Sequence, residues 1–121
     1  MREYIPQKFE GISKEFLIRA NIGRRIKPPF FKIGEYYIDS RKLGLNRQFD
    51  IVTQDKNGYI AYECKYVDSP IGKAVIEEEA RQAEGLPDIG FYRLGFISKN
   101  GFADIPNSGD YLFFSLSDFY R

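Results

Sequence analysis

Apolar residues recur at helical spacing near the start of the chain. From Pro6 to Ala20 they stand three or four positions apart, which places them on one side of an amphipathic helix. These apolar residues are Phe9, Ile12, Phe16, Leu17 and Ala20. At about 100° per residue, Glu10 lies at the border of this apolar stripe, whereas Glu15 points the opposite way. The pattern therefore predicts a first helix that can turn Glu10 toward the rest of the fold.

Three extended segments are predicted to follow this helix. Residues 30–38 read as a strand that is interrupted at Gly34. Residues 48–54 and 59–66 are rich in β-branched and aromatic residues, and the segment between them, Asp55 to Gly58, is a strong hairpin signal. This hairpin is the most strongly predicted element of the sequence.

A second helix and two further strands complete the predicted order. Ser69 as N-cap and Pro70 at the first helical position favour a helix that starts there and stops at Gly85. Residues 91–98 and 111–116 predict two more strands, with a short helix at the tail. We therefore predict an α/β fold with an α-β-β-β-α-β core. Its mixed sheet is flanked by helices, one of which crosses over between the third and fourth strands.

Composition limits the class of protein. The chain has 121 residues, of which 43% are hydrophobic and 29% charged, and we expect residues 1–121 to form one globular domain. The sequence has no run of about eighteen apolar residues that would span a membrane, and it has no signal peptide. We therefore expect a cytoplasmic protein with no membrane partner.

The residue inventory excludes several common chemistries. There is no histidine and only one cysteine, Cys64, which excludes a Ser-His-Asp triad, a Cys-His pair, a Cys/His zinc site and an intrachain disulfide. A phosphate-binding loop of the GxxxxGK[ST] kind is also missing, so the chain is not an ATPase acting alone. Any catalysis must use carboxylates, Lys, Arg, Tyr or a hard metal ion.

Charge is distributed unevenly although the net charge is only +1. Residues 1–50 hold 11 Lys and Arg against 6 Asp and Glu (+5), and residues 51–121 hold 7 against 11 (−4). Two basic clusters stand out, the first formed by Arg24, Arg25 and Lys27 and the second by Arg41, Lys42 and Arg47. They would suit contacts with nucleic-acid phosphates if folding brings them together. An ordinary solvated surface explains them equally well.

The hairpin predicts which side chains share a face. If the loop is four residues long, Asp50 lies directly opposite Glu63, and Lys65 joins both on one face of the sheet. The other face carries the apolar set of Ile51, Ile60, Tyr62 and Cys64 and marks the core side. A tighter turn at Asn57-Gly58 would put Asp50 opposite Lys65 and keep the shared face, whereas a three-residue loop would break it. Cys64 is accordingly expected to be a small buried hydrophobe and not a nucleophile.

A cation between the two acidic residues would give this face a chemistry. Opposed carboxylates with Cβ atoms roughly 5 Å apart repel each other, and oxygen ligands favour Mg²⁺ or Mn²⁺. Such an ion can bind a phosphate oxygen and acidify a water, while Lys65 stabilises charge on the phosphorus. These are the requirements of phosphodiester hydrolysis. The competing interpretation is that Lys65 only pairs with Asp50 and Glu63 across an exposed face.

At these residues the sequence resembles the PD-(D/E)XK nuclease superfamily, which has the restriction-endonuclease-like fold. More narrowly, it is similar to a domain of unknown function at the C-terminus of archaeal and some bacterial AAA-type ATPases. Five points carry the resemblance: Phe9-Glu10, Ile33 to Tyr37, Phe49 to Val52, Glu63 to Tyr66, and Ser98 to Phe102. They span most of the chain in a consistent order. The chain departs from the superfamily's name at Phe49, where that name has proline.

The resemblance implies a role for each candidate residue. It implies that Asp50 and Glu63 bind Mg²⁺ or Mn²⁺, with the backbone carbonyl of Cys64 as a further ligand. Lys65 would then be the catalytic lysine, and Glu10 the helix carboxylate that completes the site. Gln82 resembles a glutamine that some superfamily members add, although an ordinary polar helix residue is the simpler interpretation.

These inferences together favour a metal-dependent nuclease domain that binds DNA and hydrolyses its phosphodiester bonds. The ATPase part is absent, so the chain would be the C-terminal module of a larger ATPase, a partner of one, or a free-standing relative. One alternative is a non-catalytic module that binds DNA or regulates an AAA-type ATPase. Another is a small dimerisation domain with a fortuitous acidic face, and a homodimer is compatible with each of these hypotheses.

Overall fold

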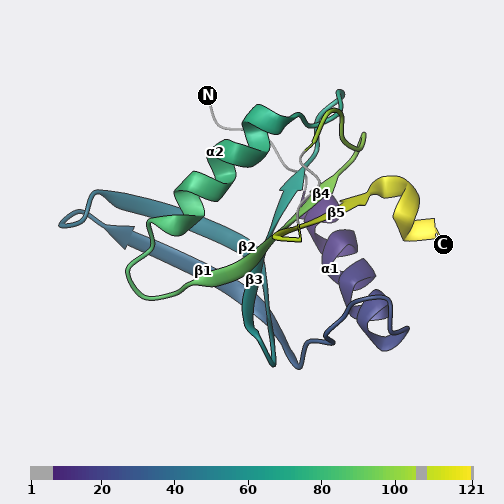
Figure 1. Cartoon of the computed structure of the whole chain (residues 1–121), viewed down its shortest axis with the longest axis horizontal. Helices are drawn as coiled ribbons and strands as arrows, with labels where there is room; N and C mark the ends of the chain where they lie inside the picture. The colour runs from purple at the N-terminus through teal and green to yellow at the C-terminus, as the bar shows by residue number, and fades with distance from the viewer. Residues whose placement is uncertain (1–6, 106–108, 121) are drawn as a thin grey trace.

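A computed structural model describes residues 7–105 and 109–120 of the chain (Figure 1). The described residues form two α-helices, five strands and a short 3-10 helix, in the order that the sequence predicts. The elements are α1 (Gln7–Ile22), β1 (Lys32–Ser40), β2 (Leu45–Asp55), β3 (Gly58–Lys65), α2 (Lys73–Glu84), β4 (Phe91–Ser98), β5 (Tyr111–Ser115) and the 3-10 helix η1 (Leu116–Tyr120). None of the described helices is both long and apolar enough to cross a membrane.

The five strands form one mixed sheet in the order β1-β2-β3-β4-β5. Strands β1, β2 and β3 are antiparallel neighbours, whereas β3, β4 and β5 run parallel. Parallel neighbours need a crossover connection, and α2 provides it between β3 and β4, as predicted. The predicted α/β class and its α-β-β-β-α-β order are therefore confirmed.

Each face of the sheet has its own hydrophobic core, and the two helices lie on opposite sides (Figure 1). The core under α1 includes the predicted helix stripe and the side chains of Ile51, Ile60, Tyr62 and Cys64. The core under α2 is built on Phe49, Val52, Ala61, Leu94 and Phe96. The competing interpretation placed Lys65 on an exposed face of the hairpin. In the structure, α2 packs against that face, and β3 is a central strand with a core on each side.

Helix α2 begins later than the sequence predicts. Its N-cap is Gly72, with an extended backbone and no side-chain cap hydrogen bond among the described residues, whereas Ser69 was the expected cap. The reason is a contact with a distant segment. The Ile71 amide donates to the Gly101 carbonyl at 2.9 Å, and the Ala103 amide donates to the Ile71 carbonyl at 3.0 Å. This short bridge holds the chain extended up to Ile71. Gly85 caps the C-terminal end as predicted.

Strands β3 and β4 approach closely at Gly95, which pairs with Tyr62. A Cβ atom on Gly95 would overlap the ring of Tyr62, and that ring is fully buried in the core under α1. The ring has no free space into which it can move. Gly95 is therefore required by packing and not by an unusual backbone angle.

We expect Gly95→Ala to lower the free energy of unfolding by about 1–3 kcal/mol, the usual cost of overpacking a core. Urea unfolding followed by circular dichroism measures the effect. Gly11→Ala is the matched control, because a Cβ there meets nothing within 4 Å and alanine favours the helix. Equal stability of Gly95→Ala and the wild type would contradict this account of the sheet.

Candidate functional site: a carboxylate and lysine cluster at the β2–β3 junction

The β2–β3 hairpin has the predicted register with a shorter loop. Gln54 pairs with Tyr59 and Ile51 pairs with Tyr62, but Asp55 also pairs with Gly58, which leaves a two-residue loop. The Asp55 carboxylate accepts a hydrogen bond from the Asn57 amide at 2.7 Å and closes this loop. The alternative turn at Asn57-Gly58 is thus wrong, because it would shift the register by two residues.

A β-bulge in β2 changes the environment of Asp50. In the pairing with β1, Gly34 is opposite Val52 and Tyr36 is opposite Phe49, so β2 holds one extra residue between these pairs. Phe49 and Val52 consequently both pack in the core under α2, which strict alternation would forbid. The described β2–β3 ladder ends one step before Asp50. The shared face predicted from alternation therefore does not extend to Asp50.

Asp50 instead contacts Glu10 in the first turn of α1. The two carboxyl groups share a side-chain hydrogen bond, and Gln48 Nε2 donates to Asp50 Oδ1 at 2.7 Å. Burial, followed by the hydrogen bond and the charge of Asp50, raises the pKa of Glu10 to about 7. Glu10 faces the sheet as the helical period predicts, while Glu15 is exposed. The structure therefore brings together two of the predicted acidic residues.

Lys65 lies at the end of β3 and points toward α2. Its ammonium group donates to Glu79 Oε1 at 2.9 Å, and the two side chains are only 10% and 20% exposed. Sequence reasoning assigned no role to Glu79 and missed this contact. The signal was present, because Glu79 is three residues after Ile76 and four before Ala83, which form the buried face of α2.

The segment after β4 fixes the end of β3. The Lys99 amide donates to the Lys65 carbonyl at 3.0 Å, and the Lys99 ammonium lies 4.5 Å above the ring of Tyr66 and 3.0 Å from Asp68. Asn100 Nδ2 donates to the Val67 carbonyl at 2.6 Å. These contacts give a physical reason for the Ser98 to Phe102 motif, because they hold the backbone that carries Lys65.

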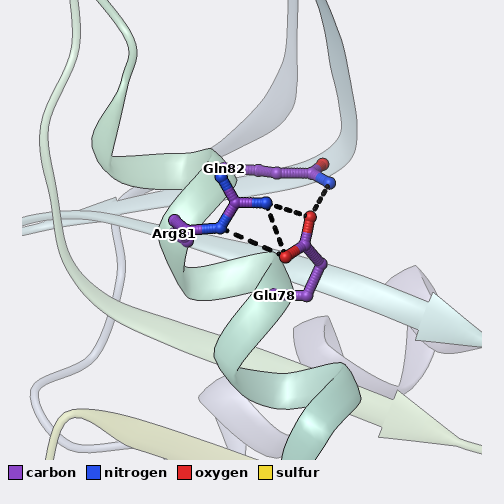
Figure 2. Close-up of polar contacts among 3 residues, drawn as sticks. All are labelled: Glu78, Arg81 and Gln82. Carbon is purple, nitrogen blue, oxygen red and sulfur yellow. Dashed lines mark hydrogen bonds and ion pairs between the residues drawn. The ribbon is translucent and has the colours of Figure 1, made fainter.

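An open groove of about 600 Å³ lies beside Glu63 and Glu79. Arg47 and Gln48 of β2 and Gln82 of α2 also line it. Figure 2 shows how Gln82 is held. Its side-chain amide donates to Glu78 at 3.0 Å, and the Arg81 guanidinium donates to the same carboxylate. The hydrogen bonds from Arg81, followed by the one from Gln82, hold the pKa of Glu78 below its usual range. Gln82 is therefore both a polar helix residue and part of the groove that contains Glu63.

The two basic clusters do not meet. Arg24, Arg25 and Lys27 follow α1, whereas Arg41 and Lys42 lie in the turn at the far end of the β1–β2 hairpin, which projects away from α1 (Figure 1). The nine residues of β1 separate the clusters by about 30 Å. The sixth basic residue, Arg47, lines the groove instead. A single basic face, the condition set for joint phosphate binding, is not formed.

The acidic residues fit an ion that is only partly held by protein. In the described part of the chain, no three His, Cys, Asp or Glu side chains are grouped to hold a metal. Mg²⁺, however, keeps several waters and uses one or two carboxylates together with substrate phosphates. The hydrogen-bonded pair of Glu10 and Asp50 fits this demand, because a cation would replace the shared proton. The thiol of Cys64 does not fit, because it is buried and its burial raises its pKa to about 12.

Comparison with known proteins gives a family and a fold. Residues 1–83 match the DUF234 family, described as archaeal and bacterial proteins of unknown function. No curated protein matches the sequence. Among solved structures, the crystal structure of a protein of unknown function, AF1548, is similar with a TM-score of 0.56 and 11% sequence identity. The match covers 88% of this chain and 59% of that one, so this chain spans less than two thirds of its length.

We expect the carboxyl pair to make stability depend on pH. The pKa of Glu10 is about 7 in the folded protein against an ordinary 4.5, so folding is favoured while this group is protonated. This contribution is complete below about pH 4.5 and is lost as the pH rises through 7. Glu10→Gln, which keeps a neutral side chain, should therefore exceed the wild type in stability by about 1–2 kcal/mol at pH 8, allowing for solvent screening.

Urea unfolding in EDTA between pH 5 and pH 8 measures this difference. Glu15→Gln is the control, because the Glu15 side chain is exposed on the other side of α1. The same pH dependence in the wild type and in Glu10→Gln would contradict the close contact between Glu10 and Asp50.

Proposed function

The chain belongs to the DUF234 family of archaeal and bacterial proteins of unknown function, and on that premise we propose that it is a divalent-metal-dependent nuclease domain. It would bind DNA and hydrolyse phosphodiester bonds. The observation that carries the proposal is the hydrogen-bonded carboxyl pair of Glu10 and Asp50 beside the strand that bears Glu63 and Lys65. The five sequence motifs that resemble the PD-(D/E)XK superfamily support it, because four of the matched positions are these residues.

The acidic residues would hold the ion. Asp50, paired with Glu10, is the proposed ligand for Mg²⁺ or Mn²⁺, and the resemblance adds Glu63 and the backbone carbonyl of Cys64. Because the bulge in β2 takes Asp50 off the face that carries Glu63, the ion and its waters would have to bridge the two carboxylates. A bound divalent cation supplies Lewis-acid chemistry, in that it polarises a phosphate oxygen and lowers the pKa of a water. Cation and proton compete for the same oxygens, so binding is expected to tighten as the pH rises.

Lys65 and Glu10 have properties that suit the chemical steps other than metal binding. Lys65 is an ammonium group in a site of low exposure, where its charge acts more strongly than in water on negative charge that develops at a phosphate. Glu79 pairs with Lys65 at 2.9 Å and fixes its position, so Glu79 is a positioning residue. Glu10 is the carboxylate beside Asp50, and its proposed role is to orient a water or accept a proton from it once a cation has replaced the shared proton.

The groove beside Glu63 is the proposed path of the DNA backbone. Arg47 carries a planar guanidinium, the group best matched to phosphate oxygens, and it lines the groove together with Gln82. A phosphate bound there lies next to Glu63 and Glu79 on the groove wall. The cation would offset the repulsion between that phosphate and these carboxylates.

A non-catalytic module is the second candidate. One observation favours it, namely that no three His, Cys, Asp or Glu side chains converge among the described residues. In this case the domain would bind DNA or regulate an AAA-type ATPase, alone or as a homodimer. Both candidates share the fold and differ in whether the wild type cleaves DNA and loses that cleavage when Lys65 is removed.

We expect Lys65→Ala and Lys65→Gln to lower Mg²⁺-dependent cleavage by at least 100-fold, because loss of one group that stabilises developing charge costs about that much. Gel assays on plasmid and on branched DNA give the rate, and a DNA-binding assay should show little change. Lys73→Ala is the control, because Lys73 is an exposed lysine on α2 paired only with Glu77. Normal cleavage by folded Lys65 variants would refute the catalytic assignment, and cleavage by neither protein would favour the second candidate.

We expect Mn²⁺ to bind one site in the wild type and at least tenfold more weakly in Asp50→Asn, which loses an anionic ligand. Isothermal titration calorimetry, with and without a short DNA duplex, measures both affinities. Asp39→Asn is the matched control, because Asp39 is exposed on β1. Equal affinity in the wild type and in Asp50→Asn, with DNA present, would contradict the proposed ligand set.

A further inference from the structure

A second cavity, of about 530 Å³, lies where the α1–β1 connection passes the turn between β2 and β3. Its size is within the range of small-molecule sites. Its walls come from two segments far apart in sequence, residues 24–31 and Lys56 of the turn. Glu10 of the candidate site is at the other end of α1, because the helix from Glu10 to Ile22 rises by about 18 Å before the chain reaches the cavity.

The apolar part of this cavity is an aromatic ring on a fixed backbone. Phe31 is 64% exposed, which is unusual for so large an apolar side chain. Its amide donates to the Gln54 carbonyl at 2.9 Å. The preceding residue, Phe30, exchanges two hydrogen bonds of 2.9 Å with the Asn21 side chain at the end of α1. Phe31 is therefore held in a solvent-facing position beside two prolines, Pro28 and Pro29.

The polar part of the cavity is positively charged. Arg24, Lys27 and Lys56 line it, and none of them forms an ion pair with any residue that the structure describes. Among the residues that the structure describes, no acidic side chain lines the cavity. Arg25, in contrast, lies 5.4 Å above the ring of Phe16 and is engaged within the fold. The cavity thus combines three available cations with a flat apolar surface.

We propose that this cavity binds an unpaired nucleotide of a nucleic-acid strand. The base stacks on Phe31, and the flanking phosphates contact Arg24, Lys27 and Lys56. Aromatic rings that stack bases within a positive groove are the usual means of binding single strands. An acidic peptide would use the cations but has no flat ring to cover Phe31. The inference deepens the proposed function, because it specifies the substrate as DNA with a single-stranded segment. It rests on the proposed function for the choice of DNA as the nucleic acid.

The first test measures the stacking contribution. A fluorescent oligodeoxythymidine of about ten nucleotides is titrated in EDTA, and anisotropy gives its affinity. We expect Phe31→Ala to bind about tenfold more weakly, in line with the usual contribution of one stacked base. Tyr120→Ala is the matched control, because Tyr120 is 82% exposed and lies in η1, outside both sites. Circular dichroism confirms folding, which removal of an exposed ring should preserve.

A second test examines the cations and the kind of ligand. Lys56→Ala should lower the slope of log affinity against log salt by about 0.7, whereas Lys73→Ala should not. Inorganic polyphosphate, which has charge but no base, should bind Phe31→Ala as well as it binds the wild type. Unchanged oligonucleotide affinity in Phe31→Ala would overturn the proposal. So would an equal loss of affinity for polyphosphate, or tighter binding of polyglutamate than of the oligonucleotide.

These outcomes are separate from those of the catalytic proposal. The assay contains no divalent ion, so its outcome does not depend on the proposed metal site. Loss of stacking in Phe31→Ala with normal cleavage of duplex DNA would support this cavity as an anchor for unpaired strands. Absence of cleavage by the wild type would refute hydrolysis and leave the binding result unaffected.

Discussion

Strand β3 is the constraint on which the rest of the structure depends, because its two faces are covered by different helices. Ile60, Tyr62 and Cys64 face the core under α1, and Ala61 faces the core under α2. Lys65 is buried at the end of this strand, so its charged group needs a counter-charge inside the fold. Glu79 provides it from the helix that the β3–β4 crossover requires. The burial of Lys65 and its pairing with Glu79 therefore both follow from the central place of β3 in the sheet.

Local patterns predicted the parts of the fold that depend on neighbours in sequence. The apolar stripe of α1 and the register of the β2–β3 hairpin follow from helical period and turn chemistry, and the structure has both. The bulge at Asp50 could not be predicted, because it arises from the pairing of β2 with β1. The start of α2 depends on Gly101, about thirty residues away. Glu79 could have been predicted from the buried face of α2. This would have required the prediction that α2 packs on the sheet face opposite to the one that α1 covers.

Clustering along the sequence and clustering in space differ most for the basic residues. Arg41 and Lys42 are close in number to the first basic cluster, yet a full strand separates them from it. Lys56 is remote in number and shares a cavity with Arg24 and Lys27. A strand carries the chain across the molecule, so charged residues that precede it and charged residues that follow it lie at opposite ends of the sheet. Turns bring distant residues back to the same end of the sheet, which is how a positive pocket forms there.

The two kinds of strand pairing in this sheet also imply an order of assembly. Paired residues in the β2–β3 hairpin are 11 or fewer positions apart, whereas those of β3 and β4 are more than thirty apart. Closing the longer loop costs more chain entropy, so the antiparallel meander can form while the parallel half is still open. A chain with only this meander formed would hold Lys65 without Glu79. The contact between Lys65 and Glu79 therefore depends on the docking of α2, and local opening of α2 would separate the two groups while the hairpin remains intact.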